Sequence, residues 1–361
     1  MFKKIAIKGF RGIKELELDD FRQINLFVGK NNCGKSTILE SLYLAISPTN
    51  AHLPVKINMF RGLQNVDENM WLTLFNKMSI DSNITISTEL NTKDKRKLVI
   101  EPNMKSATNV AITNTKIKDE LINASGDVSG SSLMFSVING LLIEYSVKPK
   151  NAKRWIKYNA QVTLDGIDGK IIPPKGYKEN LKGAYINPQT IFIDTQKRFD
   201  EIQVRKQIES IVDVLKEIDD SLVDISLGKD VIYCDIGLDR LMPINVMGDG
   251  MYRLLAIILA ISTQQDGILL IDEIDTGLHY STQEVLWSVI FKSAKKFNVQ
   301  IFASTHSLEC IKAFSSTYFN QLSKEVDIKL YRIEKRDDDI KAIDYDGEVL
   351  AASLESGWEM R

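Results

Sequence analysis

The sequence predicts an α/β nucleotide-binding fold that is interrupted by a long insertion. Three observations support this prediction. A glycine-containing loop joins an apolar strand to a helix near the N-terminus, strands and helices alternate again after about residue 240, and the segment between them follows a different pattern. We therefore expect an N-terminal lobe over residues 1–100, an insertion of β-meander and helix over residues 101–235, and a C-terminal lobe over residues 236–361.

The N-terminal lobe begins with three expected strands. Residues 3–8 and 13–18 are short strands that two glycines separate, and residues 23–28 (QINLFV) are mostly apolar, as a buried strand should be. The loop that follows leads into a helix from about residue 34 to residue 46, which stops before a proline. Residues 83–90 (NITISTEL) alternate like a strand with one solvated face.

The middle of the chain changes in character twice. Residues 102–132 are rich in Asn, Ser, Thr and Gly and predict long loops or a mobile edge, whereas residues 133–164 predict meandering β-structure. Residues 197–220 switch to helical spacing, so we expect one helix there, packed on its own lobe or forming a dimer contact. The residues on its apolar face are Ile208, Ile211, Leu215 and Ile218.

The α/β pattern of the last third ends in a β-rich tail. The expected elements are a helix after Gly250, a strand at 267–271, a helix at 281–296, a strand at 299–304, and tail strands near 328–333 and 340–345.

The clearest chemical signal is the sequence GKNNCGKS at residues 29–36, which matches the phosphate-loop pattern G-x-x-x-x-G-K-[ST]. An apolar strand precedes it and an amphipathic helix follows it, which is the context that such a loop requires. Lys35 is expected to reach the β- and γ-phosphates of ATP, and Ser36 is expected to ligate Mg²⁺. The predicted nucleotide contacts of this segment are Gly29, Asn31, Asn32, Cys33, Gly34, Lys35, Ser36 and Thr37.

A second signal is the sequence ILLIDE at residues 268–273, an apolar strand that delivers two carboxylates at its C-terminal end. Open α/β sheets bind their ligands at that end. We expect Asp272 to hold Mg²⁺ and Glu273 to polarise the attacking water. An ordinary solvated acidic turn would give the same letters, and the intact phosphate loop makes that alternative weaker.

A third signal is the sequence ASTHS at residues 303–307, again at the end of an apolar strand. A histidine at that place, His306, can hydrogen-bond the γ-phosphate or the attacking water. The chain contains two other histidines, His52 and His279, and lacks the Cys/His ligand spacing of a zinc site.

Composition and charge restrict the class of protein. Hydrophobic residues make up 44% and charged residues 26%, which is ordinary for a folded globular chain, and the net charge of −2 gives no global attraction for nucleic acid. The longest apolar run, residues 254–261, is less than half a membrane span. Three widely spaced cysteines and no secretory signal lead us to expect a cytoplasmic protein without a membrane partner.

The order of these motifs resembles the ABC-type ATPase heads of the SMC and recombination-mediator superfamily. It is most similar to the OLD-like (overcoming-lysogenization-defect) group of bacterial AAA-family ATPases of anti-phage defence. The segments that carry the resemblance cover about a third of the chain. They are IAIKGFRGIKELEL, INLFVGKNNCGKSTILESLYLA, NVMGDGMYRLLAIILAI, GILLIDEIDTGLHYSTQEVLW and VQIFASTHSLECIKAF. The resemblance implies a P-loop NTPase of ABC-ATPase head type, with a mixed sheet and an antiparallel β-subdomain.

The resemblance also implies a signature motif at Gly248, Asp249 and Gly250, where the head of a second subunit would receive ATP. This chain departs from the family pattern because Gly248 replaces the usual serine and Asp249 adds negative charge. The contact would then depend on backbone N–H groups and on Arg253. Asp275 matches the D-loop that lines the dimer seam, and Arg11 is either a nucleotide contact or an ordinary β-turn arginine.

The function that the resemblance implies is nucleotide-dependent dimerisation, or higher assembly, by two Mg·ATP held between heads. The output would be control of a separate effector, a nuclease for example, as in the ATPase subunit of PARIS-type systems. About 50 residues follow the Thr-His-Ser segment, which leaves no room for the TOPRIM nuclease domain of OLD-type nucleases.

Three other readings stay open at this point. They are a DNA-repair ATPase head that binds DNA in its ATP state, an ABC-transporter ATPase, and a structural switch that barely hydrolyses ATP. DNA contact is suggested by a basic and aromatic cluster, although a hairpin with a solvated face is the simpler explanation of the same residues. A shorter basic run at residues 93–97 is a weaker signal. The cluster consists of Lys148, Lys150, Lys153, Arg154, Trp155, Lys157 and Tyr158.

Overall fold

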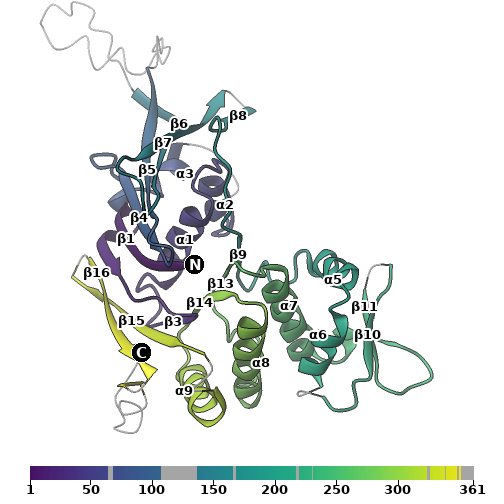
Figure 1. Cartoon of the computed structure of the whole chain (residues 1–361). Helices are drawn as coiled ribbons and strands as arrows, with labels where there is room; N and C mark the ends of the chain where they lie inside the picture. Colours follow the sequence, from purple (N-terminus) through teal and green to yellow (C-terminus); the bar gives the residue numbers. More distant parts are fainter. Residues whose placement is uncertain are drawn as a thin grey trace, which may run out of the picture.

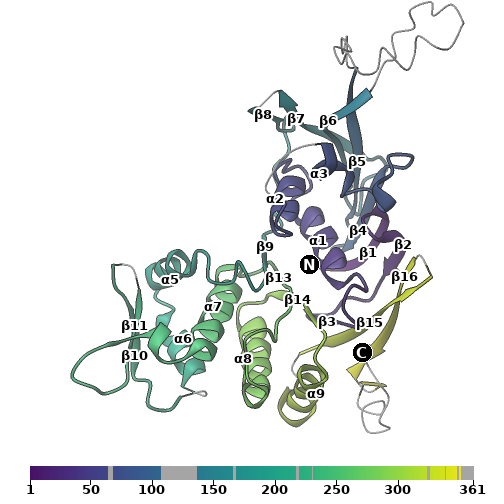
Figure 2. The same cartoon turned by 180° about the vertical axis from the view of Figure 1, so that it is seen from behind.

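A computed structural model describes residues 1–63, 68–106, 136–165, 168–216, 219–229, 231–322, 326–337, 339–347 and 349–350. Two large sheets organise these residues, with helices between the sheets and on the far side of the six-stranded one (Figures 1 and 2). This arrangement confirms the predicted α/β fold with a mixed sheet.

The sheet that carries the site has six strands in the order β16-β15-β3-β14-β13-β9. Five of them are parallel, the central three (β3, β14 and β13) are buried throughout, and β16 pairs antiparallel with β15 at one edge. The strands are β3 (Ile24–Val28), β9 (Gly183–Ile186), β13 (Ile268–Ile271), β14 (Gln300–Thr305), β15 (Ile328–Arg336) and β16 (Asp339–Asp346).

Strand β9 comes from the segment that we expected to form an insertion. It pairs parallel with β13, with Ile186 opposite Ile271. The middle of the chain therefore completes the nucleotide-binding sheet. Four residues are too few for a periodic signal, so the sequence pattern gave no indication of this strand.

The second sheet is antiparallel throughout and has the order β2-β1-β4-β5-β6-β7-β8. It confirms the expected antiparallel subdomain and the β-meander. The loop predicted over 102–132 begins instead as a strand, because β5 runs to Ser106, and residues 107–135 lie outside the described ranges. The strands are β1 (Phe2–Phe10), β2 (Ile13–Leu18), β4 (Ile84–Leu90), β5 (Lys95–Ser106), β6 (Ser136–Lys148), β7 (Ile156–Asp165) and β8 (Asp168–Ile172).

The helices cover both faces of the parallel sheet (Figure 1). Between the two sheets lies α1 (Lys35–Ile46), with α2 (Leu53–Met59), α3 (Glu68–Leu72) and the short helix η1 (Asn76–Met78) beside it. The opposite face carries α5 (Thr195–Val204), α6 (Ile208–Leu215), α7 (Asp249–Thr263), α8 (Gln283–Lys296) and α9 (Leu308–Thr317), with the short turns η2 (Ile244–Val246), η3 (Tyr280–Thr282) and η4 (Tyr318–Leu322). A small sheet of β10 (Asp224–Leu227), β11 (Ile232–Asp235) and β12 (Met242–Pro243) lies beyond α6.

The single helix predicted over 197–220 is wrong, because the chain forms two helices there. Lys206 adopts φ 57°, its N–H bonds to the carbonyl of Gln203, and the N–H of Gln207 bonds to the carbonyl of Ile202. This left-handed cap ends α5 before α6 begins. On α6, Ile211 and Leu215 are buried in the core of their own lobe, and Ile218 lies outside the described residues.

The core consists of two layers, one on each face of the parallel sheet. Leu26, Leu269 and Ile301 point towards α7 and α8, whereas Phe27 and Phe302 point towards α1 and the antiparallel sheet. The apolar run at residues 254–261 forms the middle of α7 and is at most 1% exposed. None of the helices in the described ranges combines the length and hydropathy that a membrane span requires.

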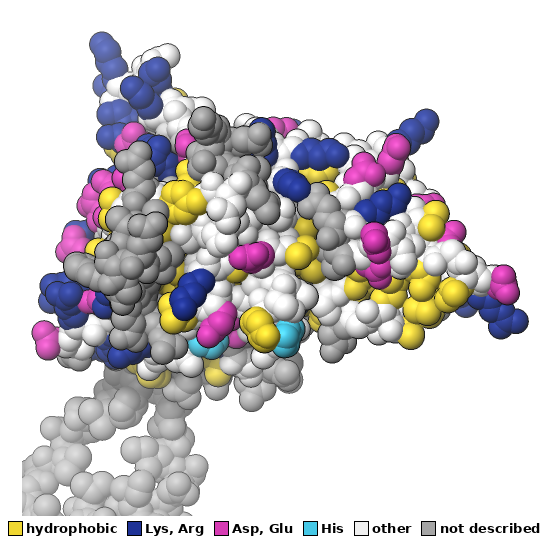
Figure 3. Space-filling view, turned by 90° about the horizontal axis from the view of Figure 1, so that it is seen from below, with side chains coloured by type: hydrophobic (Ala, Val, Ile, Leu, Met, Phe, Trp, Pro, Cys, Tyr) yellow, Lys and Arg dark blue, Asp and Glu magenta, His cyan; other side chains and the backbone are white. Residues whose placement is uncertain are grey.

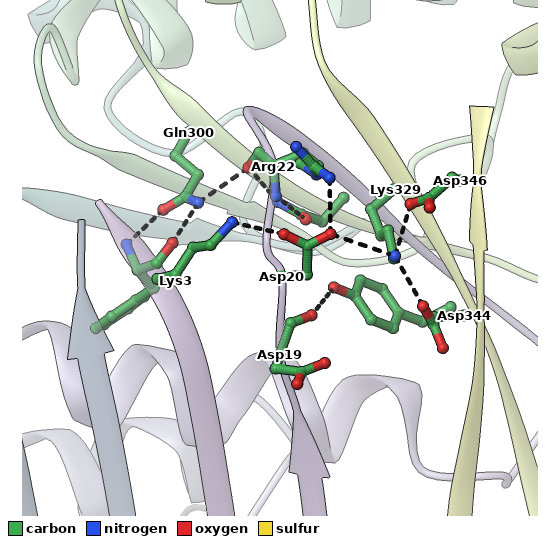
Figure 4. A network of polar contacts seen from close by, with 11 residues as sticks. Lys3, Asp19, Asp20, Arg22, Gln300, Lys329, Asp344 and Asp346 are labelled. Carbon is green, nitrogen blue, oxygen red and sulfur yellow. Dashed lines mark hydrogen bonds and ion pairs between the residues drawn. The ribbon is translucent and has the colours of Figure 1, made fainter. Parts of the chain in front are cut away.

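A polar network joins the N-terminal strands to the C-terminal hairpin (Figure 4). Lys329 on β15 lies 2.7 Å from Asp344 and 2.6 Å from Asp346 on β16, and 3.5 Å from Asp20 in the turn after β2. Burial alone would lower the pKa of Lys329, but its hydrogen bonds with the two β16 aspartates outweigh burial and raise it. Beside them, Gln300 exchanges two hydrogen bonds, of 2.7 and 2.8 Å, with the backbone of Phe2.

Candidate nucleotide-binding site

The register of the parallel sheet brings the three sequence motifs to one edge. Val28 at the end of β3 lies opposite Thr305 at the end of β14, and Ile271 at the end of β13 lies opposite Ala303. The strands are parallel, so their carboxyl ends meet at the same edge. The phosphate loop, the two acids and the histidine segment therefore lie at that edge.

The phosphate loop is closed by its own lysine. Lys35 begins α1 and donates hydrogen bonds of 2.8 Å to the carbonyls of Gly29 and Lys30, and its Nζ lies 3.8 Å from the sulfur of Cys33. Only 8% of Lys35 is exposed. The ammonium charge is thus fixed at the centre of the loop, at the N-terminus of a buried helix.

Gly29 is required by a close approach between backbones. Its φ is 145°, and a Cβ at this position would lie 2.4 Å from the carbonyl oxygen of Ile333 on β15 and 2.8 Å from the Cys33 sulfur. Any side chain would push the loop away from β15. The first glycine of the pattern therefore holds the loop against the sheet as well as permitting its turn.

The remaining loop residues differ in exposure. Asn31 and Asn32 face solvent, and Asn32 adopts φ 62°. Ser36 is half-buried in the first turn of α1, and Thr37 is buried with its hydroxyl 3.4 Å from a guanidinium nitrogen of Arg61. The exposed asparagines are placed where a ligand could reach them, and the two hydroxyls follow the lysine along the helix.

Asp272 is a buried carboxyl group whose two oxygens are both held by hydrogen bonds. It is 8% exposed, its Oδ2 accepts a 2.9 Å hydrogen bond from the Tyr185 hydroxyl on β9, and its Oδ1 accepts a short one from Ser304 on β14. Burial and then the Asp272 charge raise the pKa of Tyr185 well above its usual value. The phenol therefore keeps its proton and remains a donor to Asp272.

Glu273 has a strained backbone that the same serine supports. Its φ is 49°, its N–H donates to Oγ of Ser304 at 2.9 Å, and its Oε2 accepts a 3.2 Å bond from Thr276. A left-handed conformation at a non-glycine residue is a cost that structures keep mainly at functional sites. Ser304 thus orients both acids at once, because its hydroxyl donates to Asp272 and accepts from Glu273.

The donor atoms of Ser36 and Asp272 fit Mg²⁺. Magnesium prefers hydroxyl, carboxylate and water oxygens. Asp272 supplies a carboxylate that the Tyr185 and Ser304 hydrogen bonds hold in a fixed orientation. When bound, the ion would neutralise charge on the phosphates, with Ser36 as its second protein ligand.

Helix α7, which carries the predicted signature glycines, is linked to the two acids within the same chain. Arg253 on α7 is 5% exposed and its Nη2 lies 3.4 Å from the carbonyl oxygen of Glu273. Asp275 is also buried, and its Oδ1 accepts a 2.6 Å hydrogen bond from the Thr305 hydroxyl. Both side chains have contacts within this chain, and the contact of Arg253 with a second subunit stays a prediction.

Gly248, at the start of the predicted signature motif, has a backbone conformation that explains a glycine there. Gly248 caps α7 with φ 106° and ψ 150°, a conformation that side chains rarely adopt, although the space around it is open. Gly248 is exposed and Gly250 is half-buried in the first turn of α7. The side chain of Asp249 lies outside the described residues.

His306 directly follows the buried Thr305 and is exposed. His306 therefore follows the end of β14, which lies at the same sheet edge as the end of β13, and its role towards a ligand stays a prediction.

Two arginines share one buried carboxylate beneath the loop. Glu40 on α1 is 1% exposed, its Oε2 lies 2.7 Å from Nε of Arg11, and its Oε1 accepts a 2.7 Å bond from Nε of Arg61. Burial lowers the pKa of Arg11 to about 10, so it stays charged at neutral pH. The hydrogen bond and charge of Glu40 outweigh burial and raise the pKa of Arg61. The cluster therefore carries net positive charge.

A cavity of about 430 Å³ opens between this cluster and the phosphate loop. Volumes of this size are typical of sites for small ligands. One wall is formed by Gly34 and Thr37, and both arginines face the same space.

Sequence reasoning missed four residues of this site: Glu40, Arg61, Tyr185 and Ser304. A signal for Arg61 exists, because the tripeptide Phe-Arg-Gly occurs at residues 10–12 and again at 60–62. The arginine of each copy forms an ion pair with Glu40. Tyr185 had no such signal, because the strand that carries it was not predicted.

A protein-family model matches most of the chain. A family model described as "AAA ATPase domain" matches residues 1–311. Among curated proteins, the chain is 23% identical over 404 residues to "ATP/GTP phosphatase" of Helicobacter pylori, and the alignment covers 99% of this chain and 98% of that protein. A local match of 55% identity over 47 residues relates 13% of the chain to 22% of an uncharacterized protein, MJECL10, of Methanocaldococcus jannaschii.

Solved structures that the chain is similar to include two SMC heads. The SMC head bound to the C-terminal winged-helix domain of ScpA is 14% identical with a TM-score of 0.48, covering 98% of this chain and 99% of that one. The SMC head domain from Thermotoga maritima is 11% identical with a TM-score of 0.47, covering 96% and 99%.

Proposed function

The chain belongs to the AAA ATPase domain family and is an ATPase, and from this premise we propose that it binds Mg·ATP in the phosphate loop and hydrolyses it with Glu273 as the base. The observation that carries the proposal is the Ser304 hydroxyl, which holds the carboxylate of Asp272 and the backbone of Glu273 at the sheet edge where the loop lies. GTP is a second candidate substrate, because the Helicobacter pylori relative bears the name ATP/GTP phosphatase.

Each residue of the site has a separate role in the proposed binding and hydrolysis of ATP. Lys35 and the loop N–H groups bind the phosphates, and Ser36 and Asp272 hold the magnesium ion. Glu273 accepts a proton from the attacking water, with its carboxylate steadied by Thr276 at 3.2 Å. His306 contributes a hydrogen bond to the γ-phosphate or to the water.

Nucleotide-dependent association of two heads is the second part of the proposal. The signature glycines begin α7, and residues of α7 do not line the cavity beside the phosphate loop in the described part of the chain. Hydrophobic side chains gather at the end of the molecule that carries β10–β12 (Figure 3). The segment between β11 and α7 exposes three apolar side chains, Leu238, Leu241 and Val246, to 58%, 50% and 68%. Val246 lies two residues before Gly248, so a partner that docks on the signature would cover it.

The test combines hydrolysis with association. Glu273→Gln should bind ATP, hydrolyse it at least a hundredfold more slowly and form dimers or larger assemblies with Mg·ATP in sedimentation velocity. Lys35→Ala should neither bind nor associate. Hydrolysis by Glu273→Gln at the parent rate would overturn the base assignment, and a Glu273→Gln protein that stays monomeric with ATP bound would overturn the association.

The regulatory output is proposed from the motif resemblance. We place this ATPase in anti-phage defence, as a sensor that controls a separate effector such as a nuclease. Co-expression with the products of neighbouring genes should recover a complex whose stability depends on the nucleotide state set by Glu273→Gln and Lys35→Ala. A chain that purifies alone in both states would count against this role.

DNA binding is a second candidate function, favoured by one tertiary observation. Two basic runs distant in sequence meet at the tips of the β4–β5 and β6–β7 hairpins, where Lys95 pairs in register with Lys148 and the Lys150 N–H donates to Asp94 at 2.9 Å. Trp155 at the same tip is 43% exposed. Phosphates would be contacted by the lysines, and a base could stack on the indole.

This candidate is tested by fluorescence anisotropy with a duplex oligonucleotide at 50 and 200 mM salt. The double variant Lys150→Glu/Lys153→Glu should bind at least tenfold more weakly and with a smaller salt dependence. The matched control is Lys216→Glu/Lys229→Glu, which changes two exposed lysines, one at the end of α6 and one between β10 and β11. Equal affinities of the two variants would exclude the hairpin tips as the contact.

A further inference from the structure

The cavity beside the phosphate loop extends beyond the residues that any motif explains. Its far wall is formed by the segment from Thr73 to Met78, which includes the short helix η1. The near wall is formed by Gly34 and Thr37. A nucleotide whose phosphates lie in the loop would direct the rest of its structure into this space.

The far wall is held firmly to the turn between β1 and β2. The Arg11 N–H donates to the carbonyl of Leu74 at 2.9 Å, and the Asn76 side-chain amide donates to the carbonyl of Arg11 at 2.7 Å. Phe75 forms a β-bridge with Phe10 and is 1% exposed. The segment therefore has a fixed position relative to the cavity.

Met78 combines two unfavourable features at this wall, a strained backbone and an exposed apolar side chain. It adopts φ 56°, directly after Lys77 at φ 54°, and left-handed conformations at successive non-glycine residues are unfavourable. It also exposes 51% of a large apolar side chain. A residue that combines an exposed apolar side chain with a strained backbone departs from local structural preference, and such departures are kept mainly at functional sites.

We propose that the segment Phe75–Met78 is the nucleobase platform of the nucleotide site, with the Met78 thioether covering one face of a purine ring. A polarisable sulfur makes favourable contacts with aromatic rings. Ile340, which is 4% exposed, supplies a second apolar surface to the same cavity. The proposal rests on the proposed function, because it takes the phosphates of ATP to lie in the loop.

The experiment compares two ligands that differ only in the presence of a nucleoside. ATP and inorganic tripolyphosphate are titrated, with Mg²⁺, into the full-length parent and Met78→Gly. Met78→Gly should weaken ATP binding roughly five- to tenfold and leave tripolyphosphate binding unchanged. Its melting temperature should not fall, because glycine adopts positive φ without strain.

The matched control is Met59→Ala, because Met59 is 52% exposed and does not line the cavity. It should bind both ligands as the parent does. Unchanged ATP affinity in Met78→Gly, or an equal loss for both ligands, would overturn the platform while leaving ATP binding intact. A parent that binds neither ligand, or a Lys35→Ala variant that binds both normally, would instead overturn the proposed function.

Discussion

At the scale of single residues, the site depends on hydroxyl groups that hold the acids in place. Ser304 connects Asp272 to the backbone of Glu273, and Tyr185 donates to the second oxygen of Asp272. Outer hydrogen bonds of this kind commonly contribute 10- to 100-fold to metal affinity or activity. The catalytic geometry therefore depends on β9 and β14 as much as on the strand that carries the acids.

Tyr185→Phe tests this dependence. We expect a loss of roughly tenfold in the rate of phosphate release, because one oxygen of Asp272 loses its donor while the ring keeps its packing. The measurement is steady-state hydrolysis over a range of Mg²⁺ concentrations. Tyr43→Phe is the control, since its ring lies 5.6 Å from that of Tyr185 and no role in the site is assigned to its hydroxyl. Parent-like hydrolysis by Tyr185→Phe would show that the hydrogen bond is dispensable.

At the scale of elements, the β15–β16 hairpin is coupled to the N-terminal strands through Lys329. The lysine side chain is 4% exposed, whereas Asp20, Asp344 and Asp346 are 34%, 57% and 56% exposed. Burial opposes the ionisation of Asp20, but the hydrogen bond from Lys3 and the charges of Arg22 and Lys329 outweigh it and lower its pKa. The network holds the hairpin whose residue Ile333 contacts the phosphate loop.

Lys329→Met should lower the free energy of unfolding by about 2 kcal/mol at pH 7, because three aspartates then lose their shared cation. Because the pKa of Lys329 is raised, its contribution to the free energy of unfolding is fully present at any pH below the ordinary pKa of lysine. The lowered pKa of Asp20 makes its contribution present above about pH 4 and lost as the pH falls further. The difference between parent and variant should therefore shrink below about pH 4.

Urea unfolding at pH 7 and at pH 3.5 measures this difference. Lys341→Met, which removes an exposed lysine from β16, is the control and should change stability by less than about 0.5 kcal/mol. A penalty in Lys329→Met that stays constant between the two pH values would mean that lost packing, and not charge, is its source.

At the scale of the whole molecule, the site joins segments from both ends of the chain. The phosphate loop comes from residues 29–36, the acids from 272–273, and the cavity is completed by Lys335 and Ile340. A ligand bound there contacts segments that only the folded chain brings together. Binding should therefore stabilise the entire fold.

Addition of Mg·ATP at about a hundred times its Kd should stabilise Glu273→Gln by about 3 kcal/mol, seen as a rise of a few degrees in melting temperature. Differential scanning fluorimetry checks this. Removal of Mg²⁺ with a chelator should reverse part of the rise, and Lys35→Ala should show none. A rise of the same size in Lys35→Ala would mean that ATP binds somewhere other than the loop.

The sequence by itself determined the fold class and the motif positions, because these depend on local patterns. The phosphate loop, the strand before it and the helix after it are contiguous in the sequence. Asp272 and His306 each follow a short apolar run that is typical of a buried strand, so their positions at strand ends could be predicted. Hydrophobic periodicity and loop chemistry are local properties, so they can be read without knowing which strands pair.

Only the tertiary structure decided which distant residues complete the site. Four features depend on pairing and packing between segments. They are strand β9 with Tyr185, the two Phe-Arg-Gly arginines on Glu40, the break between α5 and α6 at Lys206, and the Met78 wall of the cavity. A four-residue strand has no period, and the repeated Phe-Arg-Gly tripeptide does not show that both arginines meet on Glu40. Their positions follow from which surfaces are buried together, and that is a property of the whole fold.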